Sequence, residues 1–156
     1  MAIQLIEGVR VKNLRLIPDD RGFLMEMLRR DDPDFKGFGQ TYLSCTYPGV
    51  VKAWHFHKQQ WDAFVCVSGM IKLVVFDSRE GSPTRGKLNE FFIGDQNRQL
   101  VHIPPGCYHG WKNIGTELSY VVNVPSEPYH YESPDEYRLD PHKNDLIPYD
   151  WSRKDG

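Results

Sequence analysis

The sequence predicts an all-β fold, a closed barrel or sandwich, and two observations carry this prediction. Short runs rich in β-branched and aromatic residues recur along the middle of the chain, separated by Gly, Pro, Asn and Asp. No long segment keeps the apolar period of a helix, and no internal repeat is apparent. At 156 residues, of which 40% are hydrophobic, the chain is long enough to bury the core of one domain. We therefore expect a single β domain over residues 1–156.

Three segments of this domain differ in composition. Residues 1–48 are expected to form N-terminal strands, and residues 49–124 the barrel core. Residues 125–156 are rich in Pro, Tyr and charged residues and poor in aliphatic ones, but they are too aromatic for typical disorder. We expect an irregular tail that packs over the barrel, with one short helix near 133–137.

The core segment contains the clearest strand signals. Two apolar runs flank Ser68-Gly69, a pattern that predicts a β-hairpin with its turn at these residues. Further strands are expected at 88–93, 99–103 and 118–124. Trp54 and Trp111 are expected to pack in the core.

Charge and cysteine content restrict the class of protein. The formal net charge of -2 gives no electrostatic reason to expect a nucleic acid or an anionic membrane as partner. Cys45, Cys66 and Cys107 have no C-x-x-C spacing and cannot all form pairs, which favours free thiols in a reducing compartment. The sequence shows no signal peptide and no transmembrane segment, so a cytoplasmic protein is expected.

Two short motifs are predicted to form one site. In an extended strand His55 and His57 point to the same face, because successive side chains alternate. The turn residues 104–106 would deliver His109 at the start of a later strand. Together with Asp62, these histidines are expected to converge inside the barrel.

The two motifs, Gly49 to Asp62 and Pro104 to Asn113, resemble the paired motifs of the cupin superfamily, with Arg98 in place of an expected glycine. This resemblance implies a cupin-type β-barrel, or jelly roll, with its site in the barrel mouth. His55, His57, Asp62 and His109 would be the candidate ligands of a divalent ion such as Fe, Mn, Ni or Zn, because three histidines and one carboxylate suit these metals.

A second and closer resemblance covers nearly the whole chain. It includes the segments 20–26, 40–44, 49–55 and 82–86, and it continues through 103–110, Asp140-Pro141 and 147–149. These segments are similar to the dTDP-4-dehydrorhamnose 3,5-epimerase family and its nucleotide-sugar relatives. The resemblance implies a homodimeric enzyme that needs no metal and acts on a nucleotide-linked 4-keto-6-deoxy sugar.

The family resemblance also implies roles for individual residues. His55 would be the base that removes the proton next to the 4-keto group, and Asp140 would orient it. His109 and Lys52 would line the sugar and phosphate region. Arg21 would bind the nucleotide diphosphate across a dimer interface formed by an N-terminal arm. Further residues expected to contact the substrate are Glu26, Gln40, His57, Gln60 and Asp62.

Three departures from the family pattern bear on the chemistry. Asp62 stands where the family has a lysine that stabilises the enolate, and His57 stands where it usually has Gln. The Tyr that acts as the opposite-face acid falls near Pro125-Ser126, so Tyr129 or Tyr131 is expected to replace it. An anionic Asp62 can support an enolate only with a cation between them, either a protonated His57 or a metal.

Three functions therefore stay open at this point. The first is a 3,5-epimerase-like enzyme with His55 as base, and the second is a metal-dependent cupin. A sugar 3,4-ketoisomerase is a variant of the first, because the H-x-H pair of His55 and His57 resembles the proton-shuttling histidines of those enzymes. The third is a sugar-nucleotide binder without catalytic activity.

Overall fold

The structure is a computed structural model that describes residues 4–155, and within these residues it contains strands and no helix. No segment of this range therefore forms a helix long and apolar enough to cross a membrane. The strands are β1 (Arg10–Asn13), β2 (Leu16–Asp19), β3 (Gly22–Met25), β4 (Tyr42–Thr46), β5 (Val51–Phe56), β6 (Asp62–Ser68), β7 (Met70–Asp77), β8 (Leu88–Gly94), β9 (Gln99–Ile103), β10 (Cys107–Asn113), β11 (Ser119–Asn123) and β12 (Tyr137–Arg138).

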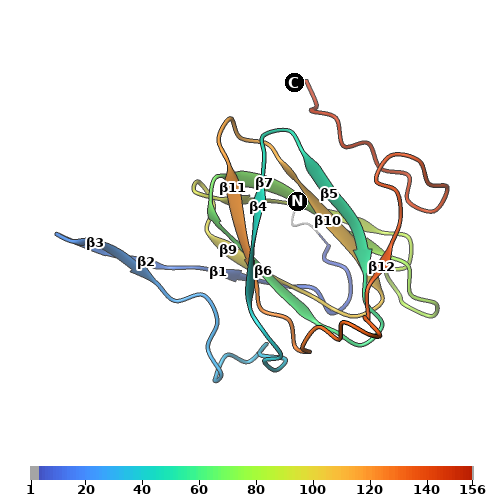
Figure 1. The fold of residues 1–156 in the computed structure, drawn as a ribbon, viewed down its shortest axis with the longest axis horizontal. Coiled ribbons are helices and arrows are strands. Elements are labelled where there is room, and N and C mark those ends of the chain that lie inside the picture. Colours follow the sequence, from blue (N-terminus) through green and yellow to red (C-terminus); the bar gives the residue numbers. More distant parts are fainter. Residues whose placement is uncertain (1–3, 156) are drawn as a thin grey trace.

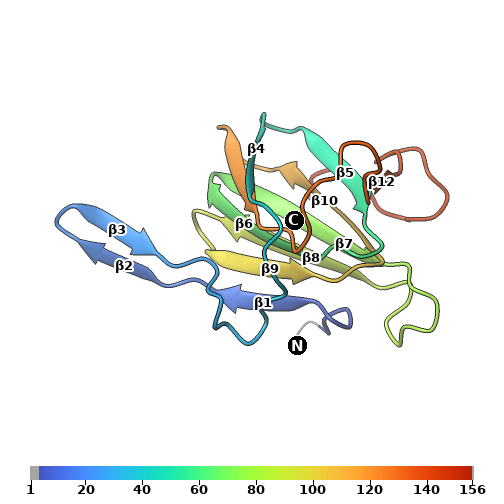
Figure 2. The ribbon, with the colours of Figure 1, turned by 60° about the horizontal axis from the view of Figure 1, so that its bottom comes forward.

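The strands form two facing antiparallel sheets and a separate hairpin (Figures 1 and 2). One sheet has the order β1-β9-β6-β11-β4 and the other the order β12-β5-β10-β7-β8. The hairpin of β2 and β3 extends away from the barrel, as Figure 2 shows most clearly. The predicted all-β jelly roll is confirmed, and the residues between the two sheets form its interior.

The hairpin predicted at Ser68-Gly69 is confirmed. Strand β6 ends at Ser68 and β7 begins at Met70. Gly69 joins them with a φ of 80°, a left-handed conformation that glycine adopts at low cost. The apolar side chains of β6 and β7 alternate, so that Phe64 and Leu73 contribute to a buried cluster between the sheets.

The C-terminal tail packs on the barrel as expected, but the short helix predicted near 133–137 is wrong. Strand β12 pairs with β5 instead, with Tyr137 opposite Phe56 and Arg138 opposite His55. Farther along, Trp151 is buried against Trp54, with ring centroids 4.9 Å apart. A second apolar cluster therefore lies on the outer face of the β5 sheet, under the tail.

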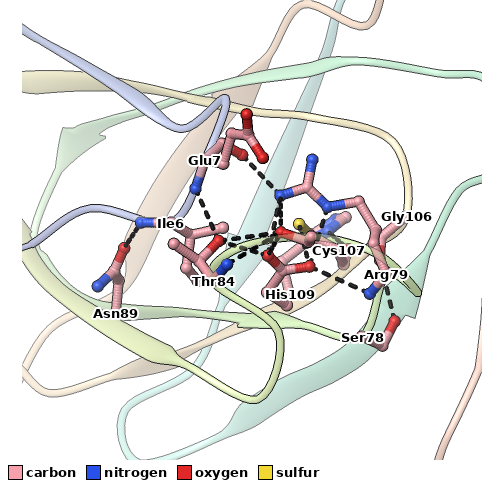
Figure 3. Close-up of polar contacts among 11 residues, drawn as sticks. Ile6, Glu7, Ser78, Arg79, Thr84, Asn89, Gly106, Cys107 and His109 are labelled. Carbon is pink, nitrogen blue, oxygen red and sulfur yellow. Dashed lines mark hydrogen bonds and ion pairs between the residues drawn. The ribbon is translucent and has the colours of Figure 1, made fainter.

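A buried carboxylate, Asp77, holds the loop that joins β7 to β8. Its side chain accepts hydrogen bonds from Arg79, Ser82 and Thr84. Arg79 and Thr84 also bond the backbone of Glu7, as Figure 3 shows. These hydrogen bonds hold the pKa of Asp77 well below its usual range. The segment 82–84 thus has a structural role, because it connects the N-terminal chain at Glu7 to Asp77.

Candidate functional site

A pocket of about 600 Å³ opens between the two sheets and contains most of the predicted site. Strand β5 supplies one wall, β4 the other, and residues of the tail complete the rim. Buried aromatic rings form the base of the pocket, among them Phe64 and Trp111. Trp111 was expected in the core, and it is buried there. It also lines the pocket, because it lies two residues after His109 and therefore on the same face of β10.

His55 and His109 face each other across neighbouring strands. They are direct partners in the pairing of β5 with β10, and their ring centroids are 6.0 Å apart. The close approach of these strands depends on Gly110, where a Cβ atom would lie 2.2 Å from that of Ala53. Burial lowers the pKa of His55 to about 4 and that of His109 to about 3. Both imidazoles are therefore neutral at physiological pH.

Asp62 lies beneath these histidines with 1% of its surface exposed, on β6 of the opposite sheet. Its Oδ2 atom is 3.4 Å from Nε2 of His57 and 3.3 Å from Nε2 of His109. Its Oδ1 atom accepts hydrogen bonds of 2.8 Å from Gln60 and Asn123. Burial raises the pKa of Asp62, whereas the charge of His57 and the two amide hydrogen bonds act in the opposite direction.

Asp135 of the tail fixes the loop that carries His57. Its carboxylate accepts hydrogen bonds from the backbone amides of Lys58, Gln59 and Gln60. Its carbonyl oxygen bonds Nδ1 of His57. Both ring nitrogens of His57 are thus engaged, one by this carbonyl and the other by Asp62. No role was predicted for Asp135, because its carboxylate bonds amides that lie 75 to 77 residues away in the chain.

Most of the predicted substrate-binding residues line the pocket. Lys52 projects from β5 and donates hydrogen bonds to Oγ of Ser44 at 2.8 Å and to the carbonyl of Cys45 at 2.6 Å. Its ammonium group gives the pocket a positive charge. The other predicted residues on the pocket wall are Gln40, His55, His57, Gln60, His109 and Tyr129.

Five predicted site residues do not line the pocket: Asp62 is buried beneath it, and the other four lie away from it. Asp140 is exposed, and its carboxylate accepts hydrogen bonds from the backbone amides of His142 and Lys143. In the described part of the chain, Asp140 therefore does not make the orienting contact with His55 that we expected, because its carboxylate bonds the backbone of the turn that follows it. Tyr131 is 89% exposed and does not line the pocket.

The other two, Arg21 and Glu26, lie on or beside the projecting hairpin. Arg21 forms an ion pair with Asp19, and Glu26 forms one with Arg29. Neither residue lines the pocket of its own chain.

The structure also adds polar groups that sequence reasoning missed. Tyr42 lines the pocket from β4, and its hydroxyl oxygen accepts a hydrogen bond of 2.9 Å from Asn123. Glu136 lies near His55, and its negative charge partly offsets the lowering of the pKa of that histidine by burial. Strand alternation from Gln40 would have indicated Tyr42, because residues two apart share a face. No sequence signal places Glu136, whose position depends on the pairing of β12 with β5.

A jelly roll that holds histidines in its mouth and a carboxylate beneath them is a cupin-type protein. A family model described as dTDP-4-dehydrorhamnose 3,5-epimerase matches residues 4–155. The chain therefore belongs to the dTDP-4-dehydrorhamnose 3,5-epimerase family.

Individual relatives agree with this assignment. The probable low-salt glycan biosynthesis epimerase Agl13 of Haloferax volcanii is 46% identical over 154 residues, covering 94% of this chain and 95% of the relative. The spore coat polysaccharide biosynthesis protein SpsL of Bacillus subtilis is 36% identical, with 95% and 97% covered. The crystal structure of a dTDP sugar isomerase from Desulfovibrio desulfuricans G20 superposes with a TM-score of 0.89 at 35% identity, covering 99% and 98% of the two chains.

Proposed function

We propose that this protein is an epimerase of a nucleotide-linked 4-keto-6-deoxy sugar, of the dTDP type, with His55 as the catalytic base. The observation that carries the proposal is the neutral imidazole of His55 in the wall of a pocket that also holds the Lys52 ammonium. A neutral imidazole can accept a proton, and the positive charge of a lysine can bind a phosphate or stabilise a developing enolate. A solved relative at 27% identity, NovW of Streptomyces spheroides, is a 4-keto-6-deoxy sugar epimerase.

The reaction begins when His55 removes the proton from the carbon next to the carbonyl, which leaves an enolate. Returning a proton to the other face of that carbon inverts its configuration. Asp62 does not stabilise the enolate directly, because its carboxylate is buried below His57 and His109: Oδ1 accepts hydrogen bonds from two amides and Oδ2 faces the two imidazoles. The cationic partner for the enolate within the pocket is Lys52, whose position on β5 is three residues before His55.

The test is exchange of the abstracted proton with solvent. In D₂O the wild-type protein should incorporate deuterium next to the carbonyl of a dTDP-4-keto-6-deoxy sugar, as followed by NMR. His55→Asn should reduce this rate about 100-fold or more, because Asn cannot act as the base. His142→Asn, an exposed tail position outside the pocket, serves as the matched control and should exchange at the wild-type rate. Unchanged exchange in His55→Asn would refute the proposal.

A homodimer forms the second part of the proposal. The β2–β3 hairpin exposes Leu16, Ile17, Phe23 and Leu24 to solvent in a single chain, and isolated two-stranded hairpins are marginally stable in water. Packing of this arm on a partner subunit would cover these side chains and bring Arg21, at the turn, to the partner's nucleotide diphosphate. We also propose a cytoplasmic location, which the three free cysteines support.

A metal-dependent reaction is the second candidate, and one observation favours it. Ligand atoms of His57, Asp62 and His109 lie within 4.8 Å of one another, so these three residues fit a divalent ion. His55, the fourth predicted ligand, is not part of this group. A bound ion would polarise the keto oxygen as a Lewis acid. Stoichiometric metal in protein purified without chelator, together with exchange that is lost on chelation, would favour this candidate over the metal-free reaction.

The ketoisomerase alternative is less well supported by the geometry. It requires His57 to shuttle a proton, yet both of its ring nitrogens are engaged by Asp62 and by the carbonyl of Asp135. His55 has no such pair of partners among the described residues and is the freer base.

A further inference from the structure

Two side chains with opposite proton-transfer properties line the pocket from different sheets. His55 belongs to β5 of one sheet, and Tyr42 belongs to β4 of the other (Figure 1). A sugar ring held between these walls would therefore present one face to the imidazole and the other to the phenol. Inversion at a carbon needs such an arrangement, because one group must remove the proton and another must return it from the opposite side.

The hydrogen bonds of Asn123 determine which way the Tyr42 proton points. The side-chain oxygen Oδ1 of Asn123 accepts a hydrogen bond of 3.0 Å from the backbone amide of Ala63, which fixes the orientation of the side-chain amide. The Asn123 NH₂ group then donates to both the Tyr42 oxygen, at 2.9 Å, and Asp62, at 2.8 Å. Since an NH₂ group has no acceptor, the Tyr42 oxygen must be the acceptor in this contact.

The hydroxyl proton of Tyr42 is consequently available. No group among residues 4–155 accepts a hydrogen bond from it. Although 41% of the Tyr42 surface is exposed, desolvation of its hydroxyl inside the pocket and the negative charge of Asp62 raise the pKa of Tyr42 to about 12, so that the phenol stays protonated through the neutral range. Tyr42 thus has the protonation state of a general acid and an unused donor in the pocket.

The tail tyrosines fit this role less well. Tyr131 is outside the pocket. Tyr129 lines the rim, but its ring packs edge-on against Tyr131 at 5.2 Å, and neither hydroxyl has a hydrogen-bond partner in the described chain that would orient it.

We propose that Tyr42 is the catalytic acid that protonates the enolate on the face opposite His55. The inference rests on the proposed epimerase function and assigns the residue that this function leaves open. In the first step the C–H bond breaks, its electrons form the enolate and His55 takes the proton. In the second step the enolate electrons form a new C–H bond with the Tyr42 proton, which leaves a tyrosinate. Proton exchange with water returns Tyr42 and His55 to their starting states.

The experiment separates proton removal from inversion. Tyr42→Phe keeps the ring and the base, so deuterium from D₂O should still enter the sugar next to the carbonyl within a few-fold of the wild-type rate. Because His55 can return a proton only to the face from which it took one, the exchanged sugar should keep its configuration. Formation of the inverted product should fall about 100-fold or more.

Two matched variants complete the design. Tyr47→Phe removes the same hydroxyl from a residue 71% exposed just beyond β4 and should leave both rates unchanged. Incorporation of 3-fluorotyrosine at position 42, which retains the hydroxyl, should restore inversion.

The possible failures are distinguishable. Wild-type protein that neither exchanges nor inverts the sugar would contradict the proposed function itself. Normal inversion by Tyr42→Phe would overturn the assignment of Tyr42 alone. So would loss of exchange together with inversion in a Tyr42→Phe protein that keeps the wild-type melting temperature and dTDP binding. Loss of inversion in Tyr129→Phe with normal inversion in Tyr42→Phe would transfer the role to Tyr129.

Discussion

At the residue scale, the histidine group was predictable and its surroundings were not. His55 and His57 share a face because they are two residues apart in a strand, and His109 follows a Pro-Gly turn, so a local pattern was sufficient. Tyr42 and Glu136 reach the same pocket through pairing with distant strands, and Asn123 lies buried behind it, bonded to Tyr42 and Asp62. Such positions depend on register between segments that no local pattern encodes.

The low pKa of His55 predicts the pH dependence of proton removal. The base must be neutral, and its pKa of about 4 lies below the ordinary value of 6.5 because burial disfavours the imidazolium. The deuterium exchange rate should therefore stay level as the pH falls from 8 through 6.5 and decrease only near pH 4. The other charges that act on His55 are His57 and His109, which lower its pKa together with Arg138, and Glu136, which raises it.

Two variants should move the pH at which the exchange rate falls in opposite directions. Glu136→Gln removes the negative charge that favours the imidazolium, so the fall in rate should move to lower pH. Arg138→Gln removes a positive charge and should move it to higher pH. Rate profiles recorded with circular dichroism as a check on folding would test both, and a fall centred near pH 6.5 in the wild type would contradict the buried, neutral base.

At the scale of elements, turns were predicted better than tail structure. The turn at Gly69 has its own chemical signal, a glycine with positive φ between two apolar runs. The expected helix near 133–137 does not form, because its residues make tertiary contacts instead. Asp135 accepts hydrogen bonds from the amides of the loop 58–60, and Tyr137 pairs with β5 in the sheet. A short segment with weak propensity follows the contacts that the rest of the fold offers.

The projecting hairpin leads to a prediction about assembly. Ile17 and Leu24 are direct cross-strand partners and share one face, on which both are exposed. Leu24→Asp should bury a charge in the proposed interface and convert the dimer into a monomer at micromolar concentration, as measured by sedimentation velocity. Leu146→Asp, at a similarly exposed leucine of the tail, should leave the dimer intact. A wild-type protein that sediments as a monomer would rule out the arm as a dimer contact.

At the scale of the whole molecule, the barrel and the tail form a single packed structure. The tail contributes Trp151 to the cluster on the outer face of the β5 sheet, and Asp135 to the loop that carries His57. The sequence predicted that the tail covers the barrel, because its aromatic content is too high for disorder. It also placed Tyr129, Tyr131 and Asp140 of the tail in the site, of which Tyr129 lines the pocket, but it did not predict the contributions of Asp135 and Glu136.

The buried contact between the tail and the barrel has a measurable contribution to stability. Trp151→Ala should lower the free energy of unfolding by about 3–5 kcal/mol, because it leaves a cavity beside Trp54. Tyr131→Ala, which removes an equally aromatic but exposed tail residue, should change it by less than about 0.5 kcal/mol. Urea unfolding would measure both, and equal effects would show that the tail is not docked through Trp151.

The pairing of β12 with β5 has a consequence for how the activity can diverge. Two residue pairs, Tyr137 with Phe56 and Arg138 with His55, connect this strand to the barrel, and Leu139 adds backbone hydrogen bonds to Trp54. Residues 127–130 of the tail border the pocket without belonging to the main apolar core. Substitutions between 127 and 130 can therefore reshape the entrance while Asp135 and the histidine-bearing strands stay in place. An ancestral barrel of this kind can acquire new sugar preferences by changing one strip of surface, with little risk to its ability to fold.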